Sequence, residues 1–562
     1  MKFSAIFSKL FGFHRNDRRF SLGNNSFERP PLPKAPDGPE LSRSLDENEK
    51  QLKTIFGLPT NMDVVIRDFQ IPGLNLKALI IYIDGLTDRN TQIFGVLEPL
   101  MVLSPEPIQK TSAAMDLIYD RLLPTHQIQR SKKRLDLING VLDGSSGLLV
   151  EGCNEALIIE TKGWEHRGVE KPTSEPVVRG PQESFNESFR ANTASVRRYI
   201  RDPKLYTEIL RVGKRSNNLL GIMYIQDIAN PKLVEEVRYR IKAISETVDY
   251  LPETGMLEEF LEDHPKSLVP QMLSTERPDR VAAYLREGHV AVLMANSPYS
   301  LVIPITFTIF LHAAEDYYLR WPFGNFLRLI RSGAIFIALL LPAIYIGVVN
   351  YHQEMIPTDL LLAMTAAREA VPFPAIVEIM FMEFSFELIR EAGVRIPSVI
   401  GPTIGIVGAL ILGQAAVTAS IVSPILIIII AITALASFVV PNYNASFTIR
   451  ISRFIFVILA AVFGFFGIAF GVFILALHLA SINSFGVPFL TPIAPYRAKN
   501  KDRVLRPRNY SQPYRPVFLR PLDLIRQKAN ARPWDRPNLN QDQDREQDSN
   551  QDQAHDQTEE DD

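Results

Sequence analysis

The feature that most constrains this chain is a run from residue 396 to residue 449 that contains no charged side chain. A helix crosses the hydrocarbon core of a bilayer with about 20 residues, so the run is too long for a single crossing. Pro424 and the stretch 414–420 divide it into two predicted spans, at about 398–415 and 420–440. The chain is therefore predicted to be an integral membrane protein.

Two further apolar segments extend this region. One covers about 332–349 and contains Pro342, which neighbouring helices can accommodate inside a membrane. The other covers about 454–479 and follows Arg450 and Arg453. We predict an all-α multi-span transmembrane domain over 326–496 with four crossings.

The segment 358–391 is helical and partly apolar, but it carries several carboxylates. Its sequence is compatible with a fifth crossing, with a re-entrant pair of helices, or with a helix that lies along the membrane surface. Glu383, Glu387 and Glu391 recur every four residues, which places them on one helical stripe with Ile376 and Met380. Carboxylates inside a membrane are costly and usually face water or a partner.

Three interpretations of this acidic stripe are open. The carboxylates are solvated at the membrane surface, or they line a pore or vestibule for cations, or they form buried pairs with Arg390 or Arg395. The residues that we predict as pore-lining or gating candidates are Glu369, Glu378, Glu383, Glu387, Glu391, Met380 and Ile376.

Glycines recur at spacings of three and four in two of the predicted spans, and small residues at such spacings allow helices to approach closely. The predicted helix-packing positions are Gly401, Gly405, Gly408, Gly467 and Gly471, with Gly464 beside the last pair. We expect these glycines to serve packing within or between subunits.

Basic residues next to a span tend to remain on the cytoplasmic side. Arg320, Arg328 and Arg331 precede the first span, and the stretch 350–357 after it has no Lys or Arg. The segment 497–536 has twelve Lys or Arg against three Asp. Both the N-terminal and the C-terminal regions are therefore predicted to be cytoplasmic, which requires an even number of crossings: four, or six if the acidic segment contributes.

Charged residues crowd the part of the chain before the first span, where short β-rich runs alternate with helical periodicity. We predict an α/β cytoplasmic domain with two lobes, 48–134 and 135–325. The predicted strands are 63–68, 76–83, 147–150, 156–160, 219–226 and 290–294. The predicted helices are 90–102, 110–122, 183–200, 231–243, 254–263 and 278–287.

Several absences narrow the function. The chain has no phosphate-binding, dinucleotide-binding, zinc-protease or nucleophile-elbow motif, so we expect neither an enzyme nor a cofactor. Its one cysteine, Cys153, excludes an intramolecular disulfide framework and a cysteine-rich metal site. Asp84 and Asp88 follow a predicted strand, where solvated loop carboxylates are the common case. The head, 1–47, is rich in proline, and the tail, 497–562, is basic and then acidic; we expect both to be disordered.

Several long strings resemble the A subunit of the GerA family of spore germinant receptors. In the soluble part they are YIDGLTDRNTQIFGVLEPLM (82–101), EKPTSEPVVRGPQESFNESFRANTASVRRYI (170–200), TERPDRVAAYLREGHVAVL (275–293) and AEDYYLRW (314–321). In the membrane part they are PTDLLLAMTAAREAVPFPAIVEIMFMEFSFELIREAGVRIP (357–397) and the apolar string 404–443. The resemblance extends over roughly 48–500.

The resemblance implies a multi-pass subunit in the spore inner membrane that helps nutrients to trigger germination. It implies as partners a transporter-like B subunit that senses the nutrient and a C subunit that is a lipoprotein. It also implies a homo-oligomeric ring that forms or gates a path for monovalent cations. We expect membrane lipids as further partners, and no nucleic acid. The alternatives are a signalling scaffold that does not conduct, and a secondary transporter.

Overall fold

The computed structural model describes residues 39–102, 111–125, 127–163, 171–395, 411–497, 502–528 and 531. Residues 38–507 and 514–524 form one compact unit that contains the two sheets and the helical bundle. The second unit consists of 1–37, 508–513 and 525–562.

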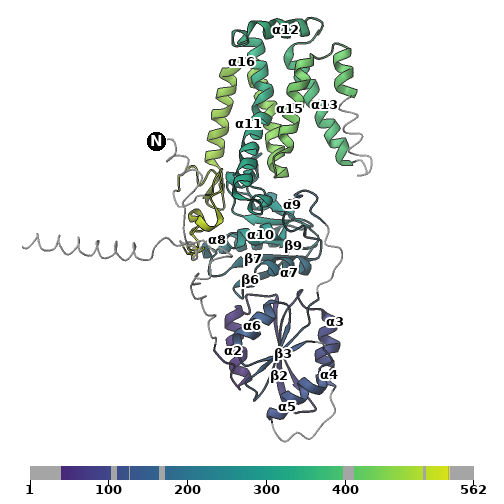
Figure 1. Cartoon of the computed structure of the whole chain (residues 1–562), viewed down its shortest axis with the longest axis vertical. Coiled ribbons are helices and arrows are strands. Elements are labelled where there is room, and N and C mark those ends of the chain that lie inside the picture. Colours follow the sequence, from purple (N-terminus) through teal and green to yellow (C-terminus); the bar gives the residue numbers. More distant parts are fainter. Residues whose placement is uncertain are drawn as a thin grey trace, which may run out of the picture. The chain divides into compact units, whose positions relative to one another are not determined.

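The first lobe is built on a five-stranded antiparallel sheet, in the order β1-β2-β4-β5-β3. Its strands are β1 (Val64–Ile71), β2 (Leu76–Ile83), β3 (Ile128–Ser131), β4 (Ser146–Val150) and β5 (Ala156–Ile159). Both faces of the sheet are buried, because alternate residues of β2 enter different cores. Ile80 faces the side of α4 and α5, whereas Leu79 faces the side of α2 and α6 (Figure 1).

The helices of this lobe lie in two layers around the sheet. On one side are α2 (Leu45–Phe56) and α6 (Arg134–Leu142). On the other are α3 (Arg89–Gln92), η1 (Ile93–Leu97), α4 (Glu98–Met101), α5 (Thr111–Leu117) and η2 (Ile118–Leu122). Ser44 caps α2 by accepting a hydrogen bond from the Glu47 amide, and Gly57 ends it in a left-handed conformation.

The second lobe repeats this architecture. Its antiparallel sheet has the order β6-β7-β9-β10-β8. The strands are β6 (Leu205–Val212), β7 (Asn218–Ile225), β8 (Leu273–Thr275), β9 (Val290–Met294) and β10 (Ser300–Ile303). Helices α7 (Phe189–Tyr199) and α10 (Pro278–Leu285) cover one face, and α8 (Pro231–Thr247) and α9 (Thr254–Leu261) cover the other.

The two lobes share one topology. In each, a helix precedes a pair of strands, further helices lead to a short edge strand, and one more helix leads to the last two strands. The strands of each sheet, counted along the chain, are arranged first, second, fourth, fifth and third. The soluble domain is thus a tandem of two α/β units with the same topology. No repeated string in the sequence indicates this duplication.

The structure corrects the predicted lobe boundary at residues 134 and 135. Strands β4 and β5 lie beyond that boundary, but they pair with β2 and β3 of the first sheet. All six predicted strands and all six predicted helices overlap elements of the structure. The sequence patterns do not predict six elements: the helices α2 and α6 and the strands β3, β6, β8 and β10. Three of these strands have only three or four residues, and β6 carries three charged or polar residues among eight.

A buried ion pair joins the two lobes. Arg197 of α7 is 1% exposed, and its Nε and Nη2 donate to the two carboxylate oxygens of Asp63 at 2.5 and 2.6 Å. Asp63 precedes β1 of the first lobe. The same guanidinium also donates to the Asn61 side chain and to the Leu205 carbonyl, so it is held by both lobes.

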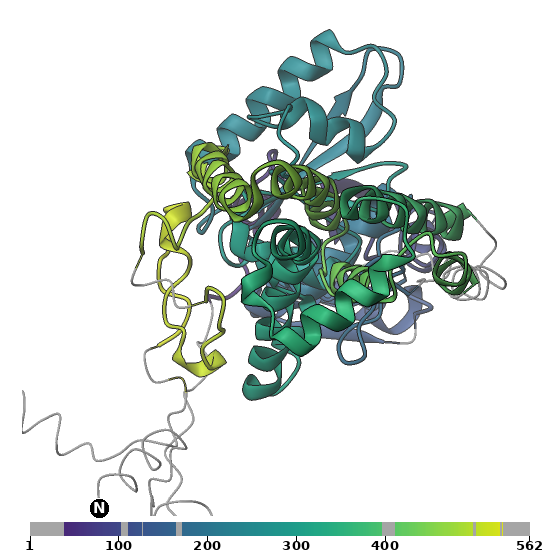
Figure 2. The ribbon, with the colours of Figure 1, turned by 90° about the horizontal axis from the view of Figure 1, so that it is seen from above.

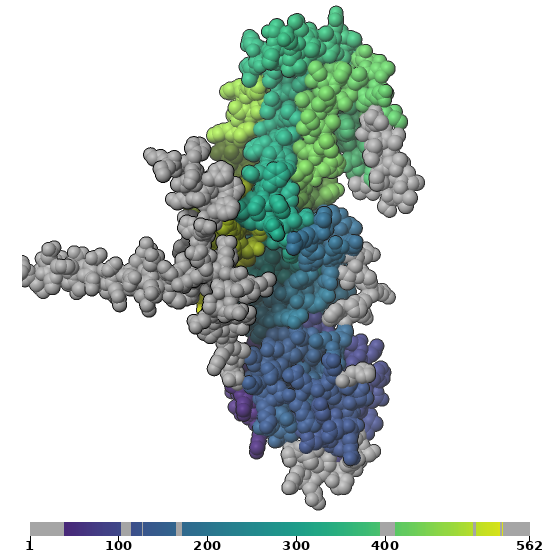
Figure 3. Space-filling model, in the orientation of Figure 1, coloured from purple at the N-terminus to yellow at the C-terminus, as the bar shows by residue number. Residues whose placement is uncertain are grey.

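The bundle that follows the second lobe contains residues 411–418 in helical conformation and, within the described ranges, five further helices. They are α11 (Trp321–Tyr351), α12 (Thr358–Glu369), α13 (Ala375–Arg395), α15 (Pro424–Phe438) and α16 (Tyr443–Ser481). A shared apolar core lies between them, and Figure 2 shows the helices of the bundle from above. Large apolar side chains such as Phe336, Leu435 and Phe466 remain exposed on the outside of the bundle, whose surface is drawn in Figure 3. This is the surface expected of helices that face lipid.

Among the described residues, two helices are long and apolar enough to cross a membrane, α11 and α16. Helix α11 contains the predicted span 332–349. Helix α15 has 15 residues and lies within the predicted span 420–440. Most of the predicted span 398–415, with Gly401, Gly405 and Gly408, lies outside the described residues.

The predicted single span at 454–479 is wrong, because α16 folds back on itself. Gly464 has φ 61° and ψ −142°, a conformation that is essentially restricted to glycine. Thr448 near one end of α16 donates to the Leu268 carbonyl, and His478 near the other end contacts the Ser267 hydroxyl. Both ends therefore reach the same loop of the second lobe, and α16 is a helical hairpin.

The predicted head and tail are also corrected in part. Residues 39–47 were assigned to a disordered head, but α2 begins at Leu45 and Leu41 is buried in the first lobe. The tail was assigned as disordered from 497, but Asp502 binds the buried Arg328 and Leu522 donates its amide to the Ile228 carbonyl. Residues 1–38 and the acidic end of the chain lie outside the described residues.

We predict that Arg197→Met destabilises the soluble domain by about 3–5 kcal/mol, because it leaves the buried Asp63 carboxylate without its partner. The measurement is pulse proteolysis of the full-length protein across a urea series. Arg198→Met is the matched control, because the neighbouring arginine pairs with Glu183 at 2.6 Å in a partly exposed position. The control should change stability by less than about 1 kcal/mol. Equal effects of the two substitutions would contradict the stabilising role of the Arg197–Asp63 pair.

The hairpin predicts the topology of α16. In a Cys153→Ser background, cysteines at Tyr443 and Ser481 should both react with a membrane-impermeant maleimide from the same side of a sealed vesicle. A cysteine at Phe463, beside the bend, should react from the opposite side. If the cysteines at 443 and 481 react from opposite sides, α16 is one straight crossing.

Candidate functional site in the helical bundle

Helix α13 brings the acidic stripe into the bundle. It begins directly after Pro374, a residue suited to the first turn of a helix. Ile379 and Met382 are buried in the apolar core of the bundle. Because this face of α13 packs against the core, Glu383, which follows Met382, also lies in the interior of the bundle, where it is 2% exposed.

The partners of this stripe come from the first arm of α16. Glu383 forms an ion pair with Arg453, whose Nη2 lies 2.6 Å from Oε2 of the carboxylate. Both side chains are almost fully buried. Glu387 is bound by Arg450, by Arg453 at 3.3 Å, and by Arg390 of its own helix at 3.3 Å. We call these five residues the α13–α16 ion cluster: Glu383, Glu387, Arg390, Arg450 and Arg453.

The cluster carries two carboxylates and three guanidinium groups, so it has one excess positive charge when all are ionised. Arg390 also donates to the Ser437 hydroxyl at 3.0 Å and lies over the ring of Phe438 at 4.6 Å. Arg453 lies half-way along the arm from Tyr443 to the bend at Gly464, with apolar helix on one side of it. Removing such charges from water costs several kcal/mol for each ion, so the cluster persists only while its members remain paired.

The pairing within the cluster is incomplete. Within the described part of the chain, Oε1 of Glu383, Nε and Nη1 of Arg453 and Nε of Arg390 are buried without a hydrogen-bond partner. Buried polar groups of this kind are destabilising and are usually satisfied by water, an ion or another group. The cluster therefore has the means to hold water or to exchange partners when the helices move.

Glu378 has a different role at the end of α13 that lies near α12. Its Oε2 accepts from the Ser423 amide at 2.9 Å, and its Oε1 lies 3.4 Å from Nη2 of Arg368. Ser423 is itself the cap of α15. Glu378 thus ties the first turn of α15 to α13 and α12, and a carboxylate next to a helix N-terminus is stabilised there.

The other predicted candidates are not gathered at one place. Glu369 and Glu391 are exposed in the single chain, and Ile376 and Met380 are partly buried against the bundle core. A Cβ atom on Gly467 would lie 2.2 Å from the Leu459 carbonyl oxygen, and one on Gly471 would lie 2.9 Å from Leu459 and Phe456. These two glycines sit where the two arms of the α16 hairpin meet.

The sequence interpretation did not identify Arg450 and Arg453 as partners of the stripe. From the sequence alone they are predicted only to flank a span. The available signal was their spacing of three residues at the start of a long apolar helix, which places them on one face. Of the three interpretations, the buried pairing describes Glu383 and Glu387 within a single chain, with arginines of α16 added to Arg390.

A second buried charge network joins the soluble domain to the bundle. Asp316 is fully buried and binds Arg328 at 3.1 Å and Arg331 at 2.7 Å, both on the first turns of α11. Arg328 also binds Asp502 of the tail at 2.5 Å. His312 contacts the Arg503 carbonyl oxygen through Nε2 at 2.6 Å. We call these residues the junction network.

Two loop carboxylates that the sequence placed after β2 have structural partners. Asp84 pairs with Arg190 of α7 at 3.1 Å. Asp88 caps α3 by accepting from both the amide and the hydroxyl of Thr91 at 2.6 Å, and these hydrogen bonds lower the pKa of its carboxyl. Asp84 thus forms an ion pair between the two lobes, and Asp88 supports the local fold of α3.

The structure combines a tandem α/β domain with an apolar helical bundle, and buried charges hold the two together. This arrangement defines a membrane protein whose α/β domain is coupled to its membrane helices. The family described as Bacillus/Clostridium GerA spore germination protein matches residues 50–518. The chain belongs to this family.

The chain is similar to several individual proteins. Spore germination protein KA of Bacillus subtilis (strain 168) is 38% identical over 497 residues, which covers 88% of this chain and 89% of that protein. Spore germination protein GerLA of Bacillus cereus is 39% identical over 485 residues, which covers 86% of this chain and 97% of that protein. The crystal structure of the N-terminal domain of the A subunit of the Bacillus megaterium spore germinant receptor GerK3 is 30% identical, with a TM-score of 0.38; the match covers 48% of this chain and 98% of that domain.

The junction network predicts a pH dependence. Burial, together with the positive charge of Arg328, lowers the pKa of His312 to about 4. The folded state therefore binds fewer protons than the unfolded state, whose histidine titrates near 6.5, so stability falls as the pH decreases through that window. At pH 5 the expected loss from this residue is about 2 kcal/mol.

The measurement is the thermal melting temperature of the full-length protein at pH 7.5 and pH 5. His312→Gln removes the titrating group and keeps a polar contact to the Arg503 carbonyl, so it should melt with a smaller pH shift than the wild type. His264→Gln, at an exposed position, is the control and should keep the wild-type shift. A wild-type shift in His312→Gln would contradict the assignment.

Proposed function

We propose that this chain is the A subunit of a nutrient germinant receptor in the spore inner membrane. Its helical bundle oligomerises to form or gate a path for monovalent cations. The family assignment and the similarity to relatives named as spore germination proteins support the receptor role. The partners implied by this role are a B subunit that senses the nutrient and a C subunit that is a lipoprotein.

The observation that carries the gating proposal is the α13–α16 ion cluster. Glu383 and Glu387 are bound by arginines, so in this conformation they are not available to a passing cation. The excess positive charge of the cluster also opposes cation entry at this point. The conformation described here is then a closed state, in which α13 is held against the first arm of α16.

Opening requires α13 and α16 to separate or slide. This movement would free the two carboxylates to face a water-filled path, which is the usual environment of ionisable residues in membranes. The unpaired polar atoms of Glu383 and Arg453 lower the barrier to such an exchange, because the closed state does not satisfy all of them. Within this proposal Glu369, Glu378, Glu391, Ile376 and Met380 remain candidates for the lining of the path in the assembled ring.

The junction network supports a second candidate function, a signalling scaffold that does not conduct. Arg328 and Arg331 fix the start of α11 to Asp316, which directly follows the second lobe. Any reorientation of the soluble tandem would therefore be transmitted to α11. A scaffold would use this coupling to relay nutrient binding to other germination proteins.

The gating proposal predicts a leak when the cluster is weakened. The receptor complex is reconstituted in liposomes, and K⁺ release is measured with and without nutrient. Glu387→Gln and Arg450→Gln should each raise the release without nutrient. The loss of one partner of a half-buried pair, about 2 kcal/mol, changes the ratio of closed to open states roughly 30-fold.

The double variant Glu387→Gln with Arg450→Gln should leak less than the sum of the two single variants, because the two side chains are coupled. Glu354→Gln removes the same charge from an exposed position between α11 and α12 and is the matched control; it should leave the basal release unchanged. Unchanged basal and nutrient-driven release in both single variants would remove the cluster from the gate. Ion release that occurs in spores but never in liposomes with the complete receptor would favour the scaffold.

A further inference from the structure

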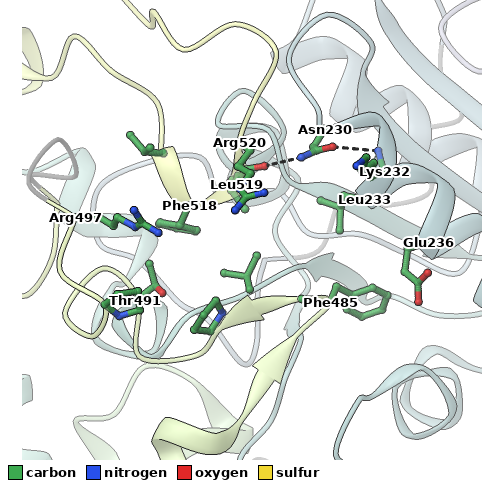
Figure 4. A pocket seen from close by; sticks show the side chains of 15 residues that line it. Asn230, Lys232, Leu233, Glu236, Phe485, Thr491, Arg497, Phe518, Leu519 and Arg520 are labelled. Carbon is green, nitrogen blue, oxygen red and sulfur yellow. Dashed lines mark hydrogen bonds between the residues drawn. The ribbon is translucent and has the colours of Figure 1, made fainter.

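A cavity of about 510 Å³ lies where the second lobe, the segment after α16 and the C-terminal segment meet. Its walls are the N-terminus of α8, the hairpin of β11 (Asn483–Ser484) and β12 (Val487–Pro488), and η7 (Val517–Leu519). Figure 4 shows the lining side chains around this space. None of the predicted site residues lines it, and it is separate from the α13–α16 ion cluster.

The rim of the cavity is cationic. Lys232, Arg497 and Arg520 line it and are exposed, and their side chains have no carboxylate partner within the described ranges. Glu236 is the carboxylate among the described lining residues, and it pairs at 2.8 Å with Arg240, which also pairs with Asp263 at 2.6 Å. Residues at the N-terminus of α8 line the cavity, and the helix dipole adds a partial positive charge there; the first-turn amides of α8 donate to its own cap, Asn230.

The floor of the cavity contains an unused hydrogen-bonding group. Thr491 is 1% exposed, and its hydroxyl oxygen is buried without a partner in the described part of the chain. Leu233, Leu519 and Val487 are apolar members of the lining. A small polar group that enters the cavity would therefore meet one unpaired hydroxyl and three cationic side chains.

The backbone of the walls is held in conformations that are unusual for side-chain-bearing residues. Arg520 has φ 49°, and Phe485 has φ 47°. Phe485 is held there by its amide, which donates to Asp263 at 2.7 Å, and by Arg240, which lies 4.3 Å from the ring centre. Phe485 and Gly486 are the two turn residues of the β11–β12 hairpin, and Arg520 is the residue that ends η7, so both left-handed conformations belong to turns that fix the walls of the cavity.

We propose that this cavity is a binding site for a phosphate-bearing anion, and that the headgroup of an anionic phospholipid is one source of it. Three cationic side chains in the lining, the dipole of a helix N-terminus and an unpaired hydroxyl are the chemistry that recognises phosphate. The wall formed by β11 and β12 begins two residues after the last membrane arm ends at Ser481, which puts the cavity near the level of lipid headgroups. The apolar floor suits the glycerol end of a lipid.

The test is native mass spectrometry of the full-length protein in detergent, titrated with phosphatidylglycerol, with phosphatidylcholine, and with inorganic phosphate. The wild type should retain one phosphatidylglycerol per chain and should bind phosphatidylcholine much more weakly. The double variant Arg497→Gln with Arg520→Gln should bind phosphatidylglycerol about 25-fold more weakly, at roughly fivefold per charge. Lys266→Gln, which removes an exposed charge outside the cavity, should leave the affinity unchanged.

Thr491→Val separates a built site from a general basic surface, because it changes no charge; it should lower the affinity a few-fold. Displacement of the lipid by inorganic phosphate would identify the phosphate itself as the recognised group. Lipid binding that phosphate does not displace would identify the complete headgroup. Equal binding of phosphatidylglycerol to the wild type and the double variant, with unchanged melting temperatures, would overturn the proposal.

Discussion

Charges buried between helices determine how this molecule is held together and how it can move. An arginine or glutamate in the interior of a helical bundle is stable only with its partner, so each buried pair fixes the relative position of the elements that supply it. Glu383 with Arg453 fixes α13 against α16. Asp316 with Arg328 fixes α11 against the second lobe, and Asp63 with Arg197 fixes the two lobes to each other.

These three buried contacts form a chain from the soluble tandem to the middle of the bundle. The hairpin of α16 completes the arrangement, because both of its ends rest on one loop of the second lobe while its first arm carries Arg450 and Arg453. A displacement of the second lobe therefore acts on α11 through the junction network and on the α13–α16 ion cluster through the base of α16. Within the described part of the chain each of the three contacts leaves a buried guanidinium nitrogen without a partner, Nη1 of Arg197 and Nη2 of Arg328 among them, and Arg453 leaves two, Nε and Nη1.

Much of the fold could be predicted from the sequence, because its signals are local. The strand 290–294 is a continuous apolar run, 76–83 is apolar apart from Lys77, and the charge-free run from residue 396 predicted a membrane domain. What could not be predicted depends on contacts between distant residues. The pairing of β4 and β5 with the first sheet moved the lobe boundary, and no local pattern reports sheet membership. The bend at Gly464 could not be predicted, because the hydropathy of the segment is continuous across it. The positive φ angle of this glycine divides the segment into the two arms of a hairpin, where the sequence predicts one crossing.

The same reasoning applies to the site. The spacing of Glu383 and Glu387 placed them on one stripe, but their environment depends on which helix packs against that stripe. Arg450 and Arg453 lie more than sixty residues away and looked like ordinary flanking charges. The role of Asp502 in the junction network was concealed by a basic, proline-containing tail that has the composition of a disordered segment.

The central claim is that α13 must leave the first arm of α16 before ions can pass. Cysteines at Glu387 and Arg450, in a Cys153→Ser background, joined by a short reducible bis-maleimide, would hold the two helices together without the ion pair. The measurement is nutrient-triggered K⁺ release from liposomes that contain this receptor, before and after reduction of the cross-link. We predict no release while the helices are linked and restored release after reduction. Full nutrient-dependent release from the linked receptor would contradict the account.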